Sequence, residues 1–177
     1  MKLILNTIYK SKLLFKSKIY YCQIGSNGIA PIFKKQEGDK RTPLGKWKLL
    51  KIYLRKDKKL NLRLKKHIRK KIILIKKKNV WCDDPSNIHY NKLVNLKKIK
   101  NNSEFSYENL FRQDDVYDIV IELNYNKNPI IKNKGSAIFI HCSFDDLRPT
   151  LGCVALKKKY LKYIINNLQT KNYIYIR

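Results

Sequence analysis

Short hydrophobic segments recur along the chain and predict a domain built mainly from β-strands. Each segment is four to eight residues long, rich in Ile, Leu, Val, Phe or Tyr, and separated from the next by polar or turn-forming residues. On this pattern we expect strands at residues 2–8, 19–24, 47–54, 117–123, 136–141 and 173–176. The strand at 136–141 ends on a histidine.

Two local patterns predict how these strands lie. Gly25, Asn27 and Gly28 form a turn after residue 24, which predicts a hairpin between residues 19–24 and 29–33. In residues 117–123, apolar side chains alternate with acidic ones, which predicts a half-buried strand.

One segment near the end of the chain has the periodicity of a helix. Leu156, Tyr160, Ile164 and Leu168 recur at every fourth position, with lysines between them. This spacing predicts an amphipathic helix of about three turns that packs one stripe on the sheet. The fold class expected from the whole pattern is mainly β with one or two helices, an α+β domain.

The length and hydropathy of the chain favour a single domain. With 177 residues and 44% hydrophobic side chains, the chain can form one core, and we expect one domain over residues 1–177. No apolar run approaches the roughly 20 residues that a membrane-spanning helix needs, so no transmembrane segment is expected. Lysines interrupt residues 1–17, which we interpret as a first strand, with no export signal visible.

The charge of the chain is extreme. Lys and Arg outnumber Asp and Glu by 40 to 13, for a formal net charge of +27. This excess would attract a polyanion, such as nucleic acid, an anionic membrane or a wall polymer. AT-rich codon usage explains the same composition, because Lys, Asn, Ile and Tyr are all abundant, and we weight it somewhat above the functional explanation.

The positive charge is densest in one stretch. Residues 46–78 contain 16 Lys or Arg and one acid, Asp57. We expect this stretch to be a basic insertion or excursion within the single domain. Stacking aromatics such as Trp47 and Tyr53 make a basic nucleic-acid-binding module the alternative from another class. Because no zinc-finger, RNP or helix-turn-helix pattern is present, no specific nucleic-acid partner is expected.

The spacing of the four cysteines predicts neither a shared disulfide framework nor a metal site. They form no CxxC pair, so a dense disulfide scaffold is not expected. A metal site is not expected either, because the nearby set of cysteines and histidines matches no zinc template; this set is Cys82, His89, His141 and Cys142.

His141 and Cys153 form the candidate catalytic pair. His141 ends an apolar strand, and twelve residues later Cys153 follows Gly152 in a turn, just before the predicted helix. A helix N-terminus and an imidazole would both lower the pKa of the thiol. Gly152 permits a tight turn whose amides could face an oxyanion. The alternative is a core histidine with a small buried cysteine. Cys142 would face away, since neighbouring strand residues point to opposite sides.

These residues resemble the signature of the YkuD family, the L,D-transpeptidases of bacterial peptidoglycan. That signature has a histidine and then a Ser/Thr-His-Gly-Cys segment, which here reads Thr150-Leu151-Gly152-Cys153. Residues 38–45 resemble the family's Thr-Pro-x-Gly segment, and further segments resemble a bacterial subgroup, namely 108–110, 117–118 and 135–139. The resemblance runs from about residue 25 to the C-terminus and implies a β-sandwich or barrel catalytic domain.

The resemblance implies a role for each residue of the site. Cys153 is the acyl-accepting nucleophile, His141 is its base, and Gly152 belongs to the oxyanion turn. Thr150, Ser143 and Arg148 belong to the substrate-binding part, where Arg148 would meet a carboxylate; a solvated loop arginine is an equally good interpretation. Neither a metal nor an organic cofactor is implied.

The implied reaction joins peptidoglycan stem peptides into cross-links through a cysteine thioester. Hydrolysis of the same peptides, as in an L,D-carboxypeptidase, is the alternative within the chemistry, and a wall-binding relative without catalysis is a third possibility. The implied partners are stem peptides and, through the basic stretch, an anionic wall polymer. The implied location is the periplasm or cell envelope, with the cytoplasm as the alternative because no signal peptide is visible.

Three departures from the family pattern concern the pocket. Leu151 stands where the family usually has histidine, and Ala155 where Arg or Asn usually stands. The gap between His141 and Cys153 is shorter than in most members. None of the three removes the nucleophile or the base.

Overall fold

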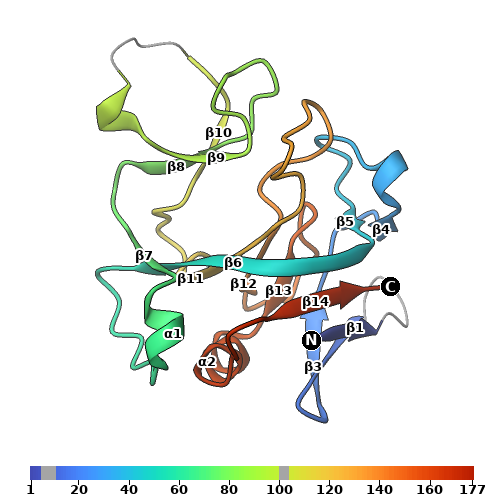
Figure 1. Ribbon diagram of the computed structural model, residues 1–177, viewed down its shortest axis with the longest axis vertical. Helices are drawn as coiled ribbons and strands as arrows, with labels where there is room; N and C mark the ends of the chain where they lie inside the picture. Colours follow the sequence, from blue (N-terminus) through green and yellow to red (C-terminus); the bar gives the residue numbers. More distant parts are fainter. Residues whose placement is uncertain (5–10, 100–103) are drawn as a thin grey trace.

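The computed structural model describes residues 1–4, 11–99 and 104–177 and is mainly β with two α-helices, as predicted (Figure 1). Nine strands form the main sheet, in the order β11-β12-β13-β3-β2-β1-β14-β6-β7. Their bounds are β1 Lys2–Ile4, β2 Ser11–Phe15, β3 Lys18–Gln23, β6 Gly45–Arg55, β7 Ile72–Ile75, β11 Ile119–Leu123, β12 Phe139–Cys142, β13 Val154–Leu156 and β14 Tyr173–Ile176. The part of the predicted strand 2–8 beyond Ile4 lies outside the described residues.

The main sheet curls until strands from opposite ends of its order meet. β6, the longest strand with 11 residues, pairs antiparallel with β14 and parallel with β7. It also pairs antiparallel with β11, the first strand of the order. Because of this extra pairing, the sheet encloses a core instead of presenting a flat face.

Two smaller sheets flank the main one. β10 (Tyr107–Asn109), β8 (Asn79–Cys82) and β9 (Lys92–Asn95) form a three-stranded antiparallel sheet. β4 (Ile29–Ala30) and β5 (Thr42–Pro43) pair in parallel. Two 3-10 turns, at Ile32–Lys34 and Leu96–Lys98, lie beside these strands. In Figure 1 the three-stranded sheet lies at the end of the molecule opposite α2 (Lys158–Asn166).

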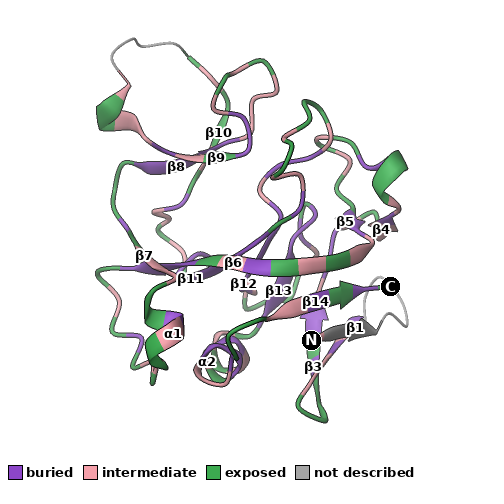
Figure 2. Cartoon of the chain, viewed as in Figure 1, coloured by how far each residue is buried: buried purple, intermediate pink, exposed green. Residues whose placement is uncertain are grey.

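The two helices differ in what they contribute. α1 (Lys66–Arg69) is a single turn that buries Ile68. α2 buries the stripe Leu161, Ile164 and Ile165 in the main core, and its outer side is exposed (Figure 2). The predicted helix therefore exists, but it begins at Lys158, because Leu156 belongs to β13.

The buried side chains form two large clusters on opposite sides of β11 and β12. Ile140 and Cys142 belong to the larger cluster under α2. Phe139 belongs to the second cluster, together with Cys153 and Trp81. This alternation follows the two-residue period of a strand, so Cys142 faces away from Cys153, as predicted.

Two predictions about strand packing were wrong. The strand at 18–23 forms its hairpin with β2, through a turn at Lys16 and Ser17, and not with residues 29–33. β11 is buried on both faces, because β6 and β12 pair along its edges and both clusters cover it. The two acidic residues of the predicted strand are buried with partners: Asp118, just before β11, pairs with Lys158, and Glu122, in β11, pairs with Lys127 at 3.0 Å.

The basic stretch 46–78 contributes directly to the main sheet. Residues 46–55 belong to β6, and β7 pairs beside it. The part that leaves the sheet is therefore confined to residues 56–71, which include α1. None of the helices in the described residues is long and apolar enough to cross a membrane.

Candidate active site

His141 and Cys153 come from two neighbouring strands. β12 and β13 pair in parallel, with Ile140 opposite Val154 and His141 opposite Ala155. Cys153 immediately precedes β13, so a strand, and not the expected helix, follows the cysteine. The predicted lowering of the thiol pKa by a helix N-terminus therefore does not apply.

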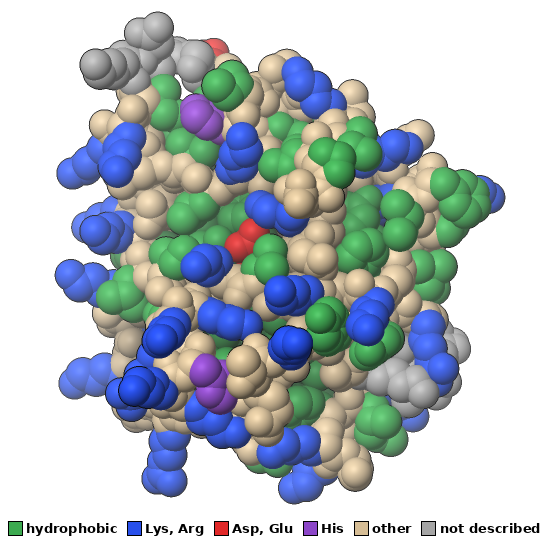
Figure 3. Space-filling model, in the orientation of Figure 1, with side chains coloured by type: hydrophobic (Ala, Val, Ile, Leu, Met, Phe, Trp, Pro, Cys, Tyr) green, Lys and Arg blue, Asp and Glu red, His purple; other side chains and the backbone are tan. Residues whose placement is uncertain are grey.

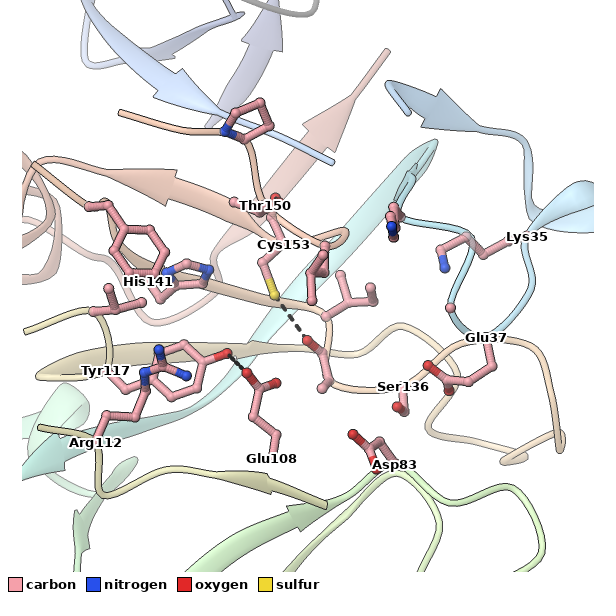
Figure 4. A pocket seen from close by; sticks show the side chains of 18 residues that line it. Lys35, Glu37, Asp83, Glu108, Arg112, Tyr117, Ser136, His141, Thr150 and Cys153 are labelled. Atoms are coloured by element: carbon pink, nitrogen blue, oxygen red, sulfur yellow. Dashed lines mark hydrogen bonds between the residues drawn. The ribbon is translucent and has the colours of Figure 1, made fainter. Parts of the chain in front are cut away.

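Both side chains line one pocket of about 380 Å³ (Figure 4). The pocket opens between the main sheet, the three-stranded sheet and the loop that joins β4 to β5. The side chains around it come from five segments of the chain; those with polar or reactive groups are Lys35, Glu37, Lys40, Asp83, Glu108, Arg112, Tyr117, Ser136, His141, Thr150 and Cys153.

The Cys153 thiol is held by two backbone groups. It donates to the carbonyl oxygen of Ala137 at 3.0 Å and accepts from the amide of Phe139 at 3.3 Å. Burial raises the pKa of this thiol well above its ordinary value, and the nearby Glu108 carboxylate adds to the shift. The resting cysteine is therefore a neutral thiol that needs a base before it can attack.

His141 has the protonation state of a base. Its Nδ1 lies 2.8 Å from the carbonyl oxygen of Cys142. Since a carbonyl only accepts, Nδ1 carries the hydrogen and Nε2 keeps its lone pair. Burial lowers the pKa of the imidazole to about 4, so the ring is neutral near pH 7. The Tyr117 ring lies edge-on to it, with centroids 5.2 Å apart.

The two side chains share the pocket wall without a hydrogen bond between them among the described residues. Figure 4 shows the imidazole beside the cysteine, with the thiol directed toward Ala137. A rotation of the thiol away from Ala137 is therefore needed before His141 can take its proton. Apo active sites often have such loose catalytic contacts.

The turn before Cys153 is fixed by Thr150. The Thr150 hydroxyl donates to the carbonyl oxygen of Cys153 at 2.7 Å and accepts from the amide of Gly152 at 3.1 Å. The Gly152 amide is thus engaged within the turn and is not a free oxyanion donor in this structure. Gly152 has φ +139°, and an added Cβ would lie 3.0 Å from the carbonyl oxygen of Arg41, so glycine is required here.

The remaining predicted residues, Arg148 and Ser143, lie outside the pocket wall. Arg148 is exposed, with its guanidinium stacked over the Phe144 ring at 3.6 Å and 3.8 Å from Asp146. Phe144 does line the pocket, so Arg148 flanks the mouth. The Ser143 amide donates to Leu156 at 2.7 Å.

Several polar side chains in the pocket were not predicted from the sequence. The Tyr117 hydroxyl donates to Glu108 at 2.6 Å. Burial raises the pKa of Glu108 despite this hydrogen bond. Arg112 makes a two-point ion pair with Asp114 and covers the Tyr117 ring. Glu108 and Tyr117 occur in the segments that resemble the YkuD subgroup, which was the only sequence signal for them.

A buried asparagine supports the wall that holds the thiol. Asn91 Oδ1 accepts from the Trp81 indole at 3.0 Å and from the Ala137 amide at 3.2 Å. Its Nδ2 donates to Asn126 at 2.6 Å. Ala137 has φ +50°, a conformation that an L-residue rarely adopts without support. Asn91 therefore fixes the segment whose carbonyl binds Cys153.

Among residues 1–4, 11–99 and 104–177 there is no group of three or more His, Cys, Asp or Glu side chains that could hold a metal ion. The polar groups of the pocket are instead spread along its walls.

Comparison with known proteins decides the family. Residues 7–176, nearly the whole chain, match the YkuD family, described as the L,D-transpeptidase catalytic domain. The chain belongs to the YkuD family. No curated protein and no solved structure matches it.

Membership assigns the protein to the L,D-transpeptidase type of enzyme, whose substrates are peptides of peptidoglycan. The match includes the segments that bring His141 and Cys153 to one pocket. Leu151, the departure from the family pattern next to Gly152, is exposed and lines the pocket mouth, whereas Ala155 is buried in β13.

Proposed function

We propose that this YkuD chain is an L,D-transpeptidase that joins peptidoglycan stem peptides through a thioester on Cys153. The observation that carries the proposal is the pairing of β12 with β13, which brings Cys153 and a neutral His141 with a free Nε2 to one pocket. A neutral imidazole beside a protonated thiol is the starting state of general-base catalysis.

The proposed acylation begins when His141 Nε2 takes the Cys153 thiol proton. The sulfur then attacks the carbonyl carbon of the diamino-acid residue in a stem peptide. The peptide C–N bond breaks, and His141 returns the proton to the departing amine, which leaves as the terminal D-amino acid. The thioester that remains holds the rest of the stem peptide.

Deacylation decides between transfer and hydrolysis. An amine of a second stem attacks the thioester carbonyl, loses a proton to His141, and releases the Cys153 thiol with a new amide bond. Attack by water would instead give the trimmed peptide of an L,D-carboxypeptidase. We favour transfer because the family that the chain matches is described by the L,D-transpeptidase reaction.

The same proposal includes the substrate contacts and the site of action. Thr150 shapes the turn against which the carbonyl would lie, and Arg148 beside the mouth would meet a carboxylate of the stem. We further propose that the enzyme acts in the periplasm or cell envelope, where its substrate is located, and that the basic surface binds anionic wall polymer.

Incubation with a synthetic tetrapeptide stem and a separate amine acceptor tests the function. Intact-mass analysis should show the acyl adduct on Cys153, and chromatography should show the cross-linked product exceeding the hydrolysed one. Cys153→Ala should give neither product, while Cys142→Ala, which changes a buried thiol on the opposite face, should retain activity. Only hydrolysed peptide would indicate the carboxypeptidase, and no adduct under any condition would overturn the enzyme proposal.

A further inference from the structure

Three carboxylates gather at one side of the active-site pocket. Glu37 comes from the loop after β4, Asp83 follows β8, and Glu108 lies in β10. Figure 4 shows all three directed toward the same space. Such a gathering is unexpected in a chain with only 13 acids and a net charge of +27, and Figure 3 shows how few acidic side chains the face drawn there carries.

These three carboxylates lack cationic partners, unlike most other acids in the chain. The salt bridges of the described residues involve seven acids: Asp39, Asp57, Asp114, Asp115, Asp118, Glu122 and Asp146. The pocket acids have neutral partners at most. Glu108 accepts from the Tyr117 hydroxyl at 2.6 Å, and Glu37 accepts from the Tyr90 hydroxyl.

The cations in the pocket wall are mostly occupied elsewhere. Lys35 is buried and pairs with Asp39 at 2.8 Å. Arg112 pairs with Asp114 at 2.7 Å. Lys40 is exposed at the rim. These three cations therefore form no ion pair with Glu37, Asp83 or Glu108.

Two further polar groups in the same wall have no partner. Ser136 is only 7% exposed and lines the pocket, yet its hydroxyl makes no hydrogen bond to any described residue. Asp83 Oδ1 is buried and lacks a partner within the same part of the chain. In Figure 4 Ser136 lies between Glu37 and Asp83. Buried polar groups are almost always satisfied, so the Ser136 hydroxyl and Asp83 Oδ1 supply hydrogen-bonding capacity for a ligand group at this side of the pocket.

We propose that Glu37, Asp83, Glu108 and Ser136 form a subsite for a primary ammonium group carried by a peptide substrate. An ammonium has three donors and no acceptor, which matches carboxylate oxygens and a serine hydroxyl placed around one space. The subsite rests on the proposed function, because it positions the peptide whose carbonyl, or whose amine, reaches Cys153.

The alternatives fit the site less well. A metal ion would need three or more ligating side chains converging on one point, and none of the described residues form such a group. An anion would be repelled by the carboxylates. Burial raises the pKa of Glu108, the Tyr117 hydroxyl and the Arg112 charge act against this shift, and Asp83 and Glu37 add to it; a bound ammonium would lower the pKa.

A binding comparison tests the subsite separately from the chemistry. The protein is Cys153→Ala, which cannot form a thioester. The probes are two synthetic stem tetrapeptides, one with the side-chain amino group of its diamino acid free and one with that group acetylated. If the ammonium belongs to the donor peptide, calorimetry should show about 10-fold to 100-fold weaker binding of the acetylated probe, the range expected for a charge-assisted hydrogen bond.

Substitution of the subsite should remove this difference. In Asp83→Asn and Glu108→Gln, each combined with Cys153→Ala, the two probes should bind within about threefold of each other. The matched controls are Asp145→Asn and Glu104→Gln, which change exposed carboxylates outside the pocket wall and should keep the full difference. Thermal unfolding shows whether each variant is folded. The comparison of the two probes on Cys153→Ala alone remains informative even if a subsite variant fails to fold.

A second experiment tests the case in which the ammonium group belongs to the acceptor peptide. With otherwise active protein, Asp83→Asn should then lower the ratio of cross-linked to hydrolysed product about 10-fold and leave donor binding unchanged. Equal binding of both probes together with an unchanged ratio, or no measurable binding of either probe, would overturn the subsite. If the thioester on Cys153 never forms while the probes still differ in binding, the subsite is supported and the proposed function fails.

Discussion

The Cys153 thiol donates to the carbonyl oxygen of Ala137 at 3.0 Å. The acceptor lies in a segment with positive φ that Asn91 holds in place. A thiolate could not donate this hydrogen bond, so the contact fixes the resting enzyme in its protonated form. The nucleophile is therefore held in a defined position and is activated only when His141 removes its proton.

Cys153 should be the cysteine that electrophiles modify first. The other three do not line the pocket: Cys22 and Cys142 lie in the main core, and Cys82 is fully buried in β8 of the three-stranded sheet. Burial raises the pKa of Cys22 and Cys142 to about 12 and raises that of Cys153 as well, so access to the pocket and to His141, and not the resting pKa, sets the preference. Peptide mapping after treatment with a mild electrophile or a carbapenem should therefore find the adduct on Cys153. Equal modification of all four, or preference for Cys142, would contradict the assignment.

Replacement of His141 should slow acylation about 10²-fold to 10⁴-fold, the usual contribution of a general base. Because the imidazole pKa is lowered to about 4, the rate in the native protein should stay level from neutral pH down to about pH 5 and fall near pH 4, where the base becomes protonated. Stopped-flow acylation measures both effects. His67→Ala and His89→Ala are the controls, and an equal loss in His89→Ala would show that the base is misassigned.

His141 should also make folding stability depend on pH. Its pKa is lowered from 6.5 in the unfolded chain to about 4 in the folded one. Between these values the unfolded chain binds the extra proton, so stability rises as pH increases from 4 to 6.5 and is lost as pH falls. The contribution is about 3 kcal/mol. Urea unfolding of native protein and His141→Gln at pH 4.5 and pH 7 should show a steeper rise of stability with pH in the native protein; equal slopes would contradict it.

Asn91→Ala should impair the site through Ala137. The change leaves the Trp81 indole and the Ala137 amide without their acceptor, and should cost about 1–3 kcal/mol of unfolding free energy. If Asn91 positions the nucleophile, kcat should fall while KM stays nearly constant. Asn95→Ala is the control, because Asn95 accepts from Lys97 at 3.0 Å, outside the pocket wall, and should affect stability alone. Equal kcat losses in both variants would indicate a merely structural role.

Charge reversal of the exposed lysines around α1 tests the wall-polymer contact. Lys65, Lys66 and Lys70 are exposed, and their replacement by Glu should slow action on whole sacculi while sparing soluble muropeptides. Lys→Arg at the same positions should leave both rates unchanged. The measurement is turnover of the two substrates at 50 and 200 mM salt. Nucleic-acid affinity that depends on phosphate contacts would fall about 10³-fold to 10⁵-fold over that range unless specific contacts to bases maintain it. Tight, sequence-selective DNA binding at 200 mM salt, without peptide turnover, would favour the alternative class.

Some strands were predictable from the sequence, and others of similar length were not. β14 lies at the predicted residues 173–176, and β6 extends the predicted strand 47–54 by a few residues. β13 was missed because three apolar residues before α2 continue the helical period. The three-stranded sheet was missed for a similar reason: β8, β9 and β10 are three or four residues long and depend on each other for pairing.

The candidate site was predictable only where its residues lie close together in the sequence. His141, Thr150 and Cys153 are within thirteen positions and share one pocket wall. Asn91, in the turn before β9, and Glu108, in β10, reach the same pocket region from segments whose arrangement is set by tertiary contacts. The charge alternation in residues 117–123 predicted a half-buried strand, which was wrong because Lys158 and Lys127 pair with Asp118 and Glu122 inside the protein.

The parallel pairing of β12 and β13 separates the position of the catalytic residues from the length and composition of the loop that joins them. His141 lies in β12 and Cys153 directly precedes β13, so the pairing of these strands sets their spacing, and the eleven intervening residues, 142–152, form the connection between them. That connection can therefore lengthen, shorten or change its exposed residues without moving the base relative to the nucleophile. The short gap and the exposed Leu151 of this chain alter the rim of the pocket, so the choice of substrate can diverge while the chemical step is preserved.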